Sequence, residues 1–119
     1  MKVVVPVADE KGDKLSEHFG RAPYFAVFEV STAGIQEEGI YPNKSDHFGG
    51  TGHPPEQIIG LGAEVVISMG MGQRAIAQFQ DANVAVLKAE TDEMLEALRE
   101  YLKGELAELT EGCLHAHNH

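Results

Sequence analysis

The stretch KVVVPVA, residues 2–8, predicts the β-strand around which the rest of the fold is built. Its apolar residues follow one another without alternating with polar ones, which is typical of a strand that is buried on both faces. We therefore place this strand at the centre of a sheet.

The segments that follow supply further strands. Residues 24–30, YFAVFEV, and residues 35–41, IQEEGIY, are joined by the short turn STAG, so they are expected to form an antiparallel hairpin. Residues 64–68, EVVIS, and residues 84–87, VAVL, predict two short strands. The chain should thus contribute five strands.

Three helices are predicted between and after the later strands. A short helix begins at Pro54 and Pro55, and a second covers residues 73–81. Thr91 is expected to cap the third helix. The apolar stripe of that helix is predicted to consist of Met94, Leu95, Leu98, Tyr101 and Leu102.

This order of elements predicts a single α/β domain with a five-stranded mixed sheet flanked by helices. If the fourth strand lies parallel beside the first, the loops after strands one, three and four emerge at the same end of the sheet. Those loops carry His18, the pair His47 and His53, and the MGMG sequence of residues 69–72. Ligands of open α/β sheets favour that end.

Composition narrows the range of functions. The 119 residues fit one domain, and the net charge of −10 makes nucleic acid an unfavourable partner. No apolar run reaches the ~18 residues of a membrane span, and no signal peptide is apparent, so we expect a cytoplasmic protein. With Cys113 as its one cysteine, the chain has no intrachain disulfide and no four-thiolate metal site.

The loop SEHFGRAPYF, residues 16–25, contains more than a turn requires. Gly20 permits a close backbone approach or a positive φ, and Arg21 adds a permanent positive charge. Together with the imidazole of His18, these residues suit an anionic ligand that contains a metal. Alternatively, His18 bonds a nearby carbonyl and only fixes the turn.

Two further segments are candidates at the same end of the sheet. Gly70 and Gly72 stand at a helix start, where the helix dipole favours an anion, although a tight turn explains them equally well. The glycine-rich residues 46–53, DHFGGTGH, suit a mobile lid or plain flexibility.

The C-terminal residues 111–119 alternate metal-binding side chains with others. Cys113, His115, His117 and His119 suit zinc, copper or iron, so we predict a metal-contacting tail after a domain of residues 1–110. A terminus without function is the alternative. Because imidazole binds metal only in its neutral form, histidine ligation predicts that affinity falls below roughly pH 6.

Several of these segments, taken in order, resemble a known family. They are KVVVPVAD, SEHFGRAPYF, GTGHPPE, AEVVISMGMGQRA and VAVL. The ordered set is similar to the dinitrogenase iron–molybdenum cofactor biosynthesis family, of the NifX/NifY type also found at the end of NifB. The likeness covers about residues 1–103 and implies a ribonuclease H-like fold. It also implies an iron–sulfur or iron–molybdenum type cluster as the ligand, with His18 as a candidate cluster ligand.

We therefore predict a non-catalytic accessory protein, a monomer or homodimer, that takes a metallocluster from a donor protein to an acceptor protein. The expected cluster-binding residues are His18, Phe19, Gly20, Arg21, His53, Gly70 and Gly72. The expected metal ligands are His18, Cys113, His115 and His117. Two alternatives stay open: a zinc, nickel or copper binder that uses the tail, and a domain that binds a small anion or metabolite.

Overall fold

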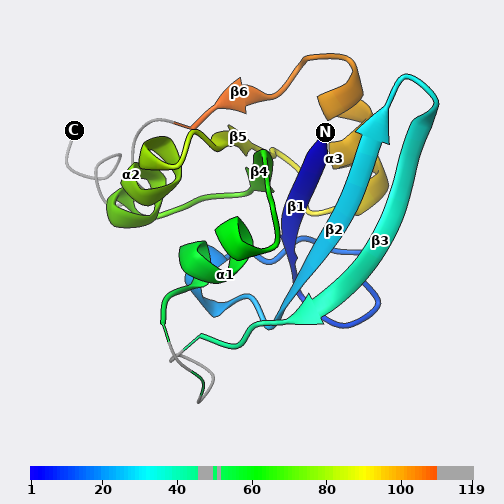
Figure 1. The fold of residues 1–119 in the computed structure, drawn as a ribbon. Coiled ribbons are helices and arrows are strands. Elements are labelled where there is room, and N and C mark those ends of the chain that lie inside the picture. The colour runs from blue at the N-terminus through cyan, green and yellow to red at the C-terminus, as the bar shows by residue number, and fades with distance from the viewer. Residues whose placement is uncertain (46–49, 51, 110–119) are drawn as a thin grey trace.

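The computed structural model describes residues 1–45, 50 and 52–109. Its sheet has six strands in the order β3-β2-β1-β4-β5-β6 (Figure 1). The strands are β1 Lys2–Val7, β2 Tyr24–Ser31, β3 Gly34–Pro42, β4 Val65–Ser68, β5 Ala85–Lys88 and β6 Ala107–Glu108.

Helices cover both faces of this sheet. They are the 3₁₀ turn η1 Phe19–Arg21 and the helices α1 Pro54–Gly60, α2 Gln73–Asp81 and α3 Met94–Leu102. Figure 1 shows α1 and α2 on one face of the sheet and α3 on the other. Each face therefore has its own hydrophobic core.

The central position predicted for the first strand is confirmed. β1 pairs along its whole length with antiparallel β2, and on its other side Val3 and Val4 pair with Val65 and Val66 of parallel β4. Val3 to Val7 are all buried, as the unbroken apolar run predicts. One buried strand with two different kinds of neighbour is what makes the sheet mixed.

The two cores divide the side chains of β1 between them. The core under α1 and α2 includes Val4, Phe25, Ile58, Ile76 and Phe79. The core under α3 includes Val3, Val5, Phe28, Met94 and Leu98. Alternate residues of β1 thus serve opposite faces, which fixes the register of its pairing.

The prediction of five strands was wrong, because a sixth strand, β6, pairs antiparallel with β5. It spans only two residues, Ala107–Glu108, and both are exposed, so the sequence carries no alternating pattern there. The pairing is extended by the Leu109 N–H, which donates to the Val86 carbonyl at 2.8 Å. The ribonuclease H-like assignment stays a prediction.

The predicted start of the third helix was also wrong. α3 begins at Met94 with Glu93 as its N-cap residue. The Thr91 hydroxyl accepts a hydrogen bond from the Glu93 N–H at 3.1 Å, so Thr91 shapes the turn before the helix rather than capping it. Two members of the predicted stripe, Leu95 and Leu102, are 76% and 55% exposed.

In the described part of the chain, no helix has the length and apolar character to cross a membrane. The predicted tail of residues 111–119, with Cys113, His115, His117 and His119, lies outside the described residues, as does His47. Most of the predicted lid, residues 46–53, lies there too.

Candidate functional site

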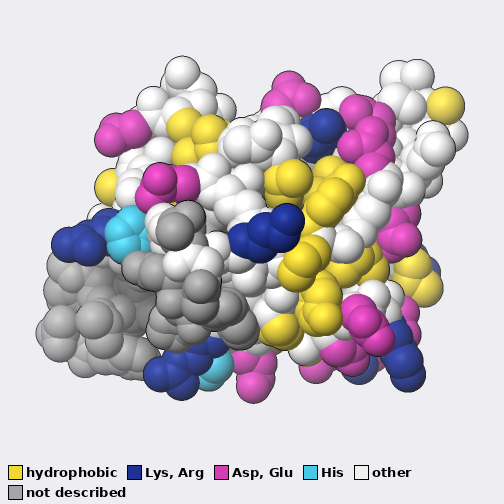
Figure 2. All heavy atoms as spheres, turned by 60° about the horizontal axis from the view of Figure 1, so that its bottom comes forward, with side chains coloured by type: hydrophobic (Ala, Val, Ile, Leu, Met, Phe, Trp, Pro, Cys, Tyr) yellow, Lys and Arg dark blue, Asp and Glu magenta, His cyan; other side chains and the backbone are white. Residues whose placement is uncertain are grey.

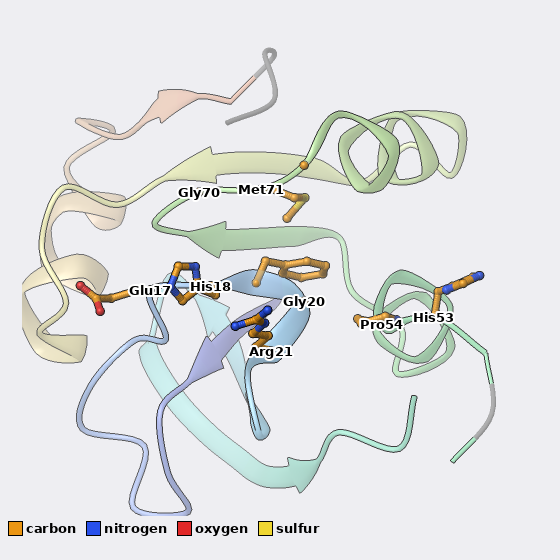
Figure 3. Close-up of a pocket in the computed structure, with 10 residues that line it drawn as sticks. Glu17, His18, Gly20, Arg21, His53, Pro54, Gly70 and Met71 are labelled. Atoms are coloured by element: carbon orange, nitrogen blue, oxygen red, sulfur yellow. The ribbon is translucent and has the colours of Figure 1, made fainter. Parts of the chain in front are cut away.

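A cavity of about 380 Å³ opens at the carboxyl ends of β1 and β4, where three loops meet. It is lined by Glu17, His18, Phe19, Gly20, Arg21, His53, Pro54, Gly70, Met71 and Gly72 (Figure 3). All seven residues predicted to bind a cluster are in this lining. The structure therefore brings together segments that are distant in the sequence.

The HFG segment, residues 18–20, forms one wall of the cavity, and its backbone makes a single 3₁₀ turn with Arg21. The Arg21 N–H donates to the His18 carbonyl at 3.2 Å, and the Ala22 N–H donates to the Phe19 carbonyl at 3.3 Å. Ser16 reinforces the start of the turn, because its hydroxyl donates to the His18 carbonyl at 3.0 Å and accepts from the His18 N–H at 3.3 Å. The backbone groups of His18 are thus occupied locally, while its side chain is exposed.

Phe19 anchors this turn to the core. Its side chain is buried, and its ring meets Phe79 of α2 edge to face, with the ring centroids 5.8 Å apart. The residues on either side of Phe19, namely His18, Gly20 and Arg21, are all exposed. One buried aromatic ring therefore holds an otherwise polar turn at the mouth of the cavity.

A buried side chain, that of Asn43, ties the same turn to the segment that follows β3. Its amide nitrogen donates to the Ala22 carbonyl at 2.8 Å, and its amide oxygen accepts from the Ser45 N–H at 2.9 Å. The Asn43 N–H also donates to the Pro23 carbonyl at 2.8 Å. The sequence analysis missed Asn43, since nothing in its local pattern distinguishes it from an ordinary loop residue.

The first part of the loop that carries His18 is hydrogen-bonded to the start of α3, on the other face of the sheet. The Leu15 N–H donates to the Asp92 carbonyl at 2.7 Å, and the Met94 N–H at the start of α3 donates to the Asp13 carbonyl at 3.0 Å. The loop that carries His18 is therefore connected to α3 as well as to α2.

The opposite wall is the turn from β4 into α2. The hydroxyl of buried Ser68 donates to the Gly70 carbonyl at 2.8 Å and shapes this turn. Gly72 is the N-cap residue of α2, so the positive end of the helix dipole lies at the cavity. Met71 is 1% exposed and, with Phe19, gives the cavity an apolar floor.

Of the two reasons given for Gly20, the positive φ was wrong, and the close backbone approach of a ligand stays a prediction. Gly20 does not have a positive φ, and a Cβ placed on it would meet nothing within 4 Å. The same open space surrounds Gly72. The fold itself therefore tolerates a side chain at both positions, and the free space lies on the rim of the cavity.

His53 reaches the cavity from the start of α1, where it is the N-cap residue. Its N–H donates to the Glu56 carboxylate at 3.1 Å, which fixes the backbone at the helix start. Figure 3 shows the His53 ring pointing away from His18, and Glu17 pointing to the opposite side from Arg21. His53 thus stands at the outer rim.

The charge at the mouth of the cavity differs from that of the whole molecule. In the view of Figure 2, Lys or Arg side chains border both described histidines. The lining contains one cation, Arg21, and one carboxylate, Glu17, together with the imidazoles of His18 and His53. In a chain of net charge −10, this is a local region that can accept an anion.

Among the described residues, no group of three or more His, Cys, Asp and Glu side chains is arranged to hold a metal ion. A metal bound at the cavity would therefore receive few protein ligands from this part of the chain. Three lining residues, Glu17, Pro54 and Met71, were missed by the sequence analysis. Met71 belongs to the MGMG sequence, but sequence cannot show which methionine faces the cavity.

Comparison with known proteins gives relatives of similar length. The uncharacterized protein MJ0580 of Methanocaldococcus jannaschii is 28% identical over 108 residues, which is 89% of each chain. The crystal structure of PH0822 has a TM-score of 0.77 at 26% identity and covers 92% of this chain and 96% of that one.

A third relative shares the fold. The apo form of the orange protein from Desulfovibrio gigas has a TM-score of 0.76, is 19% identical, and covers 92% of this chain and 93% of its own. At that identity the likeness concerns the arrangement of helices and strands alone.

A match between this chain and a protein-family profile confirms the resemblance inferred from the ordered motifs. The profile of the family described as "Dinitrogenase iron-molybdenum cofactor" matches residues 1–104, from the first strand to just beyond α3. The match includes every described residue that lines the cavity. This chain therefore belongs to the dinitrogenase iron–molybdenum cofactor family.

Proposed function

We propose that this protein binds an iron–sulfur or iron–molybdenum type cluster at the cavity and carries it from a donor protein to an acceptor protein without transforming it. The cluster is the cargo of the protein. The observation that carries the proposal is the meeting of His18, Arg21 and the start of α2 around one cavity in a member of this family.

The lining residues fit such a cargo in three ways. The exposed His18 imidazole is a suitable ligand for iron. Arg21 and the positive end of α2 offset the negative charge of a cluster. Phe19 and Met71 provide an apolar floor to the cavity. The polarisable sulfides on the surface of a cluster can contact this floor at little cost in hydration.

The small number of ligands favours carriage over assembly. Building a cubane cluster ordinarily requires four cysteines, and this chain has one. A cargo held by His18 and by complementary charge exchanges more readily than one held by several thiolates. We therefore expect no turnover, and we expect transfer to depend on the acceptor protein.

Anaerobic titration with an isolated cluster, followed by absorbance, tests the proposal. We expect the wild-type protein to bind, and His18→Ala to weaken binding by at least about tenfold, because it removes a metal ligand. His53→Ala serves as a matched control, since it deletes an imidazole at the same cavity that points away from His18. We expect it to have the smaller effect.

A second pair of variants separates charge from ligation. Arg21→Gln and Arg99→Gln remove the same charge, but Arg99 lies on α3, on the other face of the sheet. The proposal requires that Arg21→Gln weakens cluster binding more than Arg99→Gln. Equal binding by wild type, His18→Ala and Arg21→Gln would refute it.

A small-anion site is the alternative that the cavity itself supports, because an arginine beside a helix start also suits phosphate or molybdate. That alternative predicts a thermal shift with these anions and no need for iron. The zinc, nickel or copper alternative concerns residues 111–119, so deletion of residues 113–119 should abolish metal-ion binding but only weaken cluster binding.

A further inference from the structure

Another cavity, which we call the α1 cavity, lies between α1 and the segment that follows β3. It has a volume of about 460 Å³ and is lined by Tyr41, Lys44, Gly52, His53, Glu56, Gln57 and Leu61. Sites for small molecules in proteins are ordinarily of roughly 300–1,000 Å³. His53 lines both this cavity and the one at His18, and Figure 3 shows its ring pointing away from His18. The imidazole of His53 is therefore available to the α1 cavity.

Hydrogen bonds between the two walls hold the α1 cavity in shape. The side-chain oxygen of Gln57 accepts from the Lys44 N–H at 2.7 Å, and its nitrogen donates to the Pro42 carbonyl at 2.8 Å. The Glu56 carboxylate accepts from the His53 N–H at 3.1 Å. These bonds connect α1 to the end of β3 without help from any ligand, so the cavity is already formed in the free protein.

The apolar part of the lining is a tyrosine ring beside a leucine. Tyr41 is 40% exposed, although it lies within β3. A Cβ placed on Gly39 would come within 3.2 Å of the Tyr41 atoms Cε2, Cζ and Oη, so the absence of a side chain at Gly39 leaves room for this ring. Together with Leu61, the ring offers an apolar surface on which another planar ring can pack.

The charged part of the lining is an unpaired cation. Ion pairs involve the side chains of Lys2, Lys14, Lys88 and Arg99, but among the described residues no carboxylate pairs with Lys44. Lys44 is also exposed. In a chain of net charge −10, a cation without an internal partner at the edge of a cavity suits an anionic group from outside.

We propose that the α1 cavity binds a small organic anion in which a planar ring carries a carboxylate or a phosphate. The ring packs on Tyr41 and Leu61, while Lys44 pairs with the anionic group and the His53 imidazole donates a hydrogen bond to it. An inorganic anion would leave the apolar surface uncovered, and an uncharged ring would leave Lys44 unpaired. The proposal does not depend on the function of the His18 cavity.

Titration of the ¹⁵N-labelled full chain, followed by NMR, tests the site. Benzoate should shift the amide signals of Tyr41, Lys44 and Leu61 with a dissociation constant of about 1–5 mM, as expected for so small a ligand. Benzamide has the ring without the charge, and acetate has the charge without the ring. Each should bind at least about fivefold more weakly than benzoate. Adenosine monophosphate tests a phosphate source, and tighter binding than benzoate would favour a nucleotide-like ligand.

Charge variants test the role given to Lys44. Lys44→Gln should weaken benzoate binding at least about fivefold, and Lys44→Arg should retain most of it, because the charge stays. Lys103→Gln removes the same charge at the end of α3 and serves as the control. Arg21→Gln, at the His18 cavity, should also leave benzoate binding unchanged.

Ring variants test the role given to Tyr41. Tyr41→Ala should weaken benzoate binding, whereas Tyr41→Phe should preserve it, since the ring is kept. The exposure of Tyr41 implies that both variants fold, and their thermal midpoints check this.

The proposal is overturned if neither benzoate nor adenosine monophosphate gives saturable shifts up to about 20 mM. It is also overturned if benzamide or acetate binds as tightly as benzoate, if Lys44→Gln has no effect, or if the shifts fall at His18 and Gly72 instead. A Lys44→Gln protein that loses benzoate binding but still binds cluster would support this site and leave the proposed function intact.

Discussion

Asn43 joins two loops of the cavity through a single buried side chain. We expect Asn43→Ala to lower the free energy of unfolding by about 2–4 kcal/mol, because it strands the Ala22 carbonyl and the Ser45 N–H without partners. Urea denaturation measures this loss. Gln80→Ala on the exposed side of α2 should change it by less than about 0.5 kcal/mol. Similar losses for both variants would contradict the role given to Asn43.

Gly20 and Gly72 provide a test that separates folding from binding. A Cβ on either residue enters open space, so Gly20→Ala and Gly72→Ala should leave the thermal midpoint within a few degrees of wild type. We expect both to weaken cluster binding, because the new methyl groups occupy the rim of the cavity. Gly60→Ala, also in open space but in α1, should leave binding unchanged, as titration would show.

At the level of elements, α2 supports the cavity in two ways, since it begins at Gly72 and presses Phe79 against Phe19. We expect Phe79→Leu to destabilise the fold by about 1–2 kcal/mol and also to weaken cluster binding, because the HFG turn loses its aromatic anchor. Phe28→Leu makes the same change in the core under α3. It should destabilise the protein comparably while leaving cluster affinity near wild type.

The elements also show what the sequence could predict. The unbroken apolar run of β1 predicted a central strand, and from that placement the meeting of three loops followed. β6 could not be predicted, because its two exposed residues form a strand only beside the edge of β5. In α3, periodicity identified five apolar positions but not which of them face the sheet. Ala97 is buried while Leu95 is exposed.

The candidate site was predictable to a similar degree. Loops at one end of a sheet must converge, so His18 and Gly72 were expected near each other. The direction of the His53 ring was not predictable, because it depends on how α1 is oriented against the core. The open space at Gly20 was not predictable either, since the presence of a glycine in the sequence does not reveal whether the fold requires its conformational freedom.

For the whole molecule, the net charge of −10 would govern the first approach of the proposed anionic cargo. The overall field repels a free anionic cluster, and salt screens this repulsion at distances beyond a Debye length of about 10 Å at 0.1 M. We therefore expect the association rate constant of a free anionic cluster to rise between 10 and 150 mM salt in stopped-flow experiments. A falling rate would show that Arg21 dominates even at long range. Delivery from a basic donor protein should show the opposite salt dependence.

The parallel pairing of β1 with β4 also has a consequence for the order in which the chain acquires structure. Val3 meets Val65 roughly 60 positions later, whereas β2 and β3 meet across a two-residue turn. During synthesis at about 5–20 residues per second, β1 waits several seconds for its parallel neighbour. Both walls of the cavity depend on this late pairing of β1 with β4. A nascent chain on the ribosome should therefore be unable to take up cargo until residues beyond α2 have emerged.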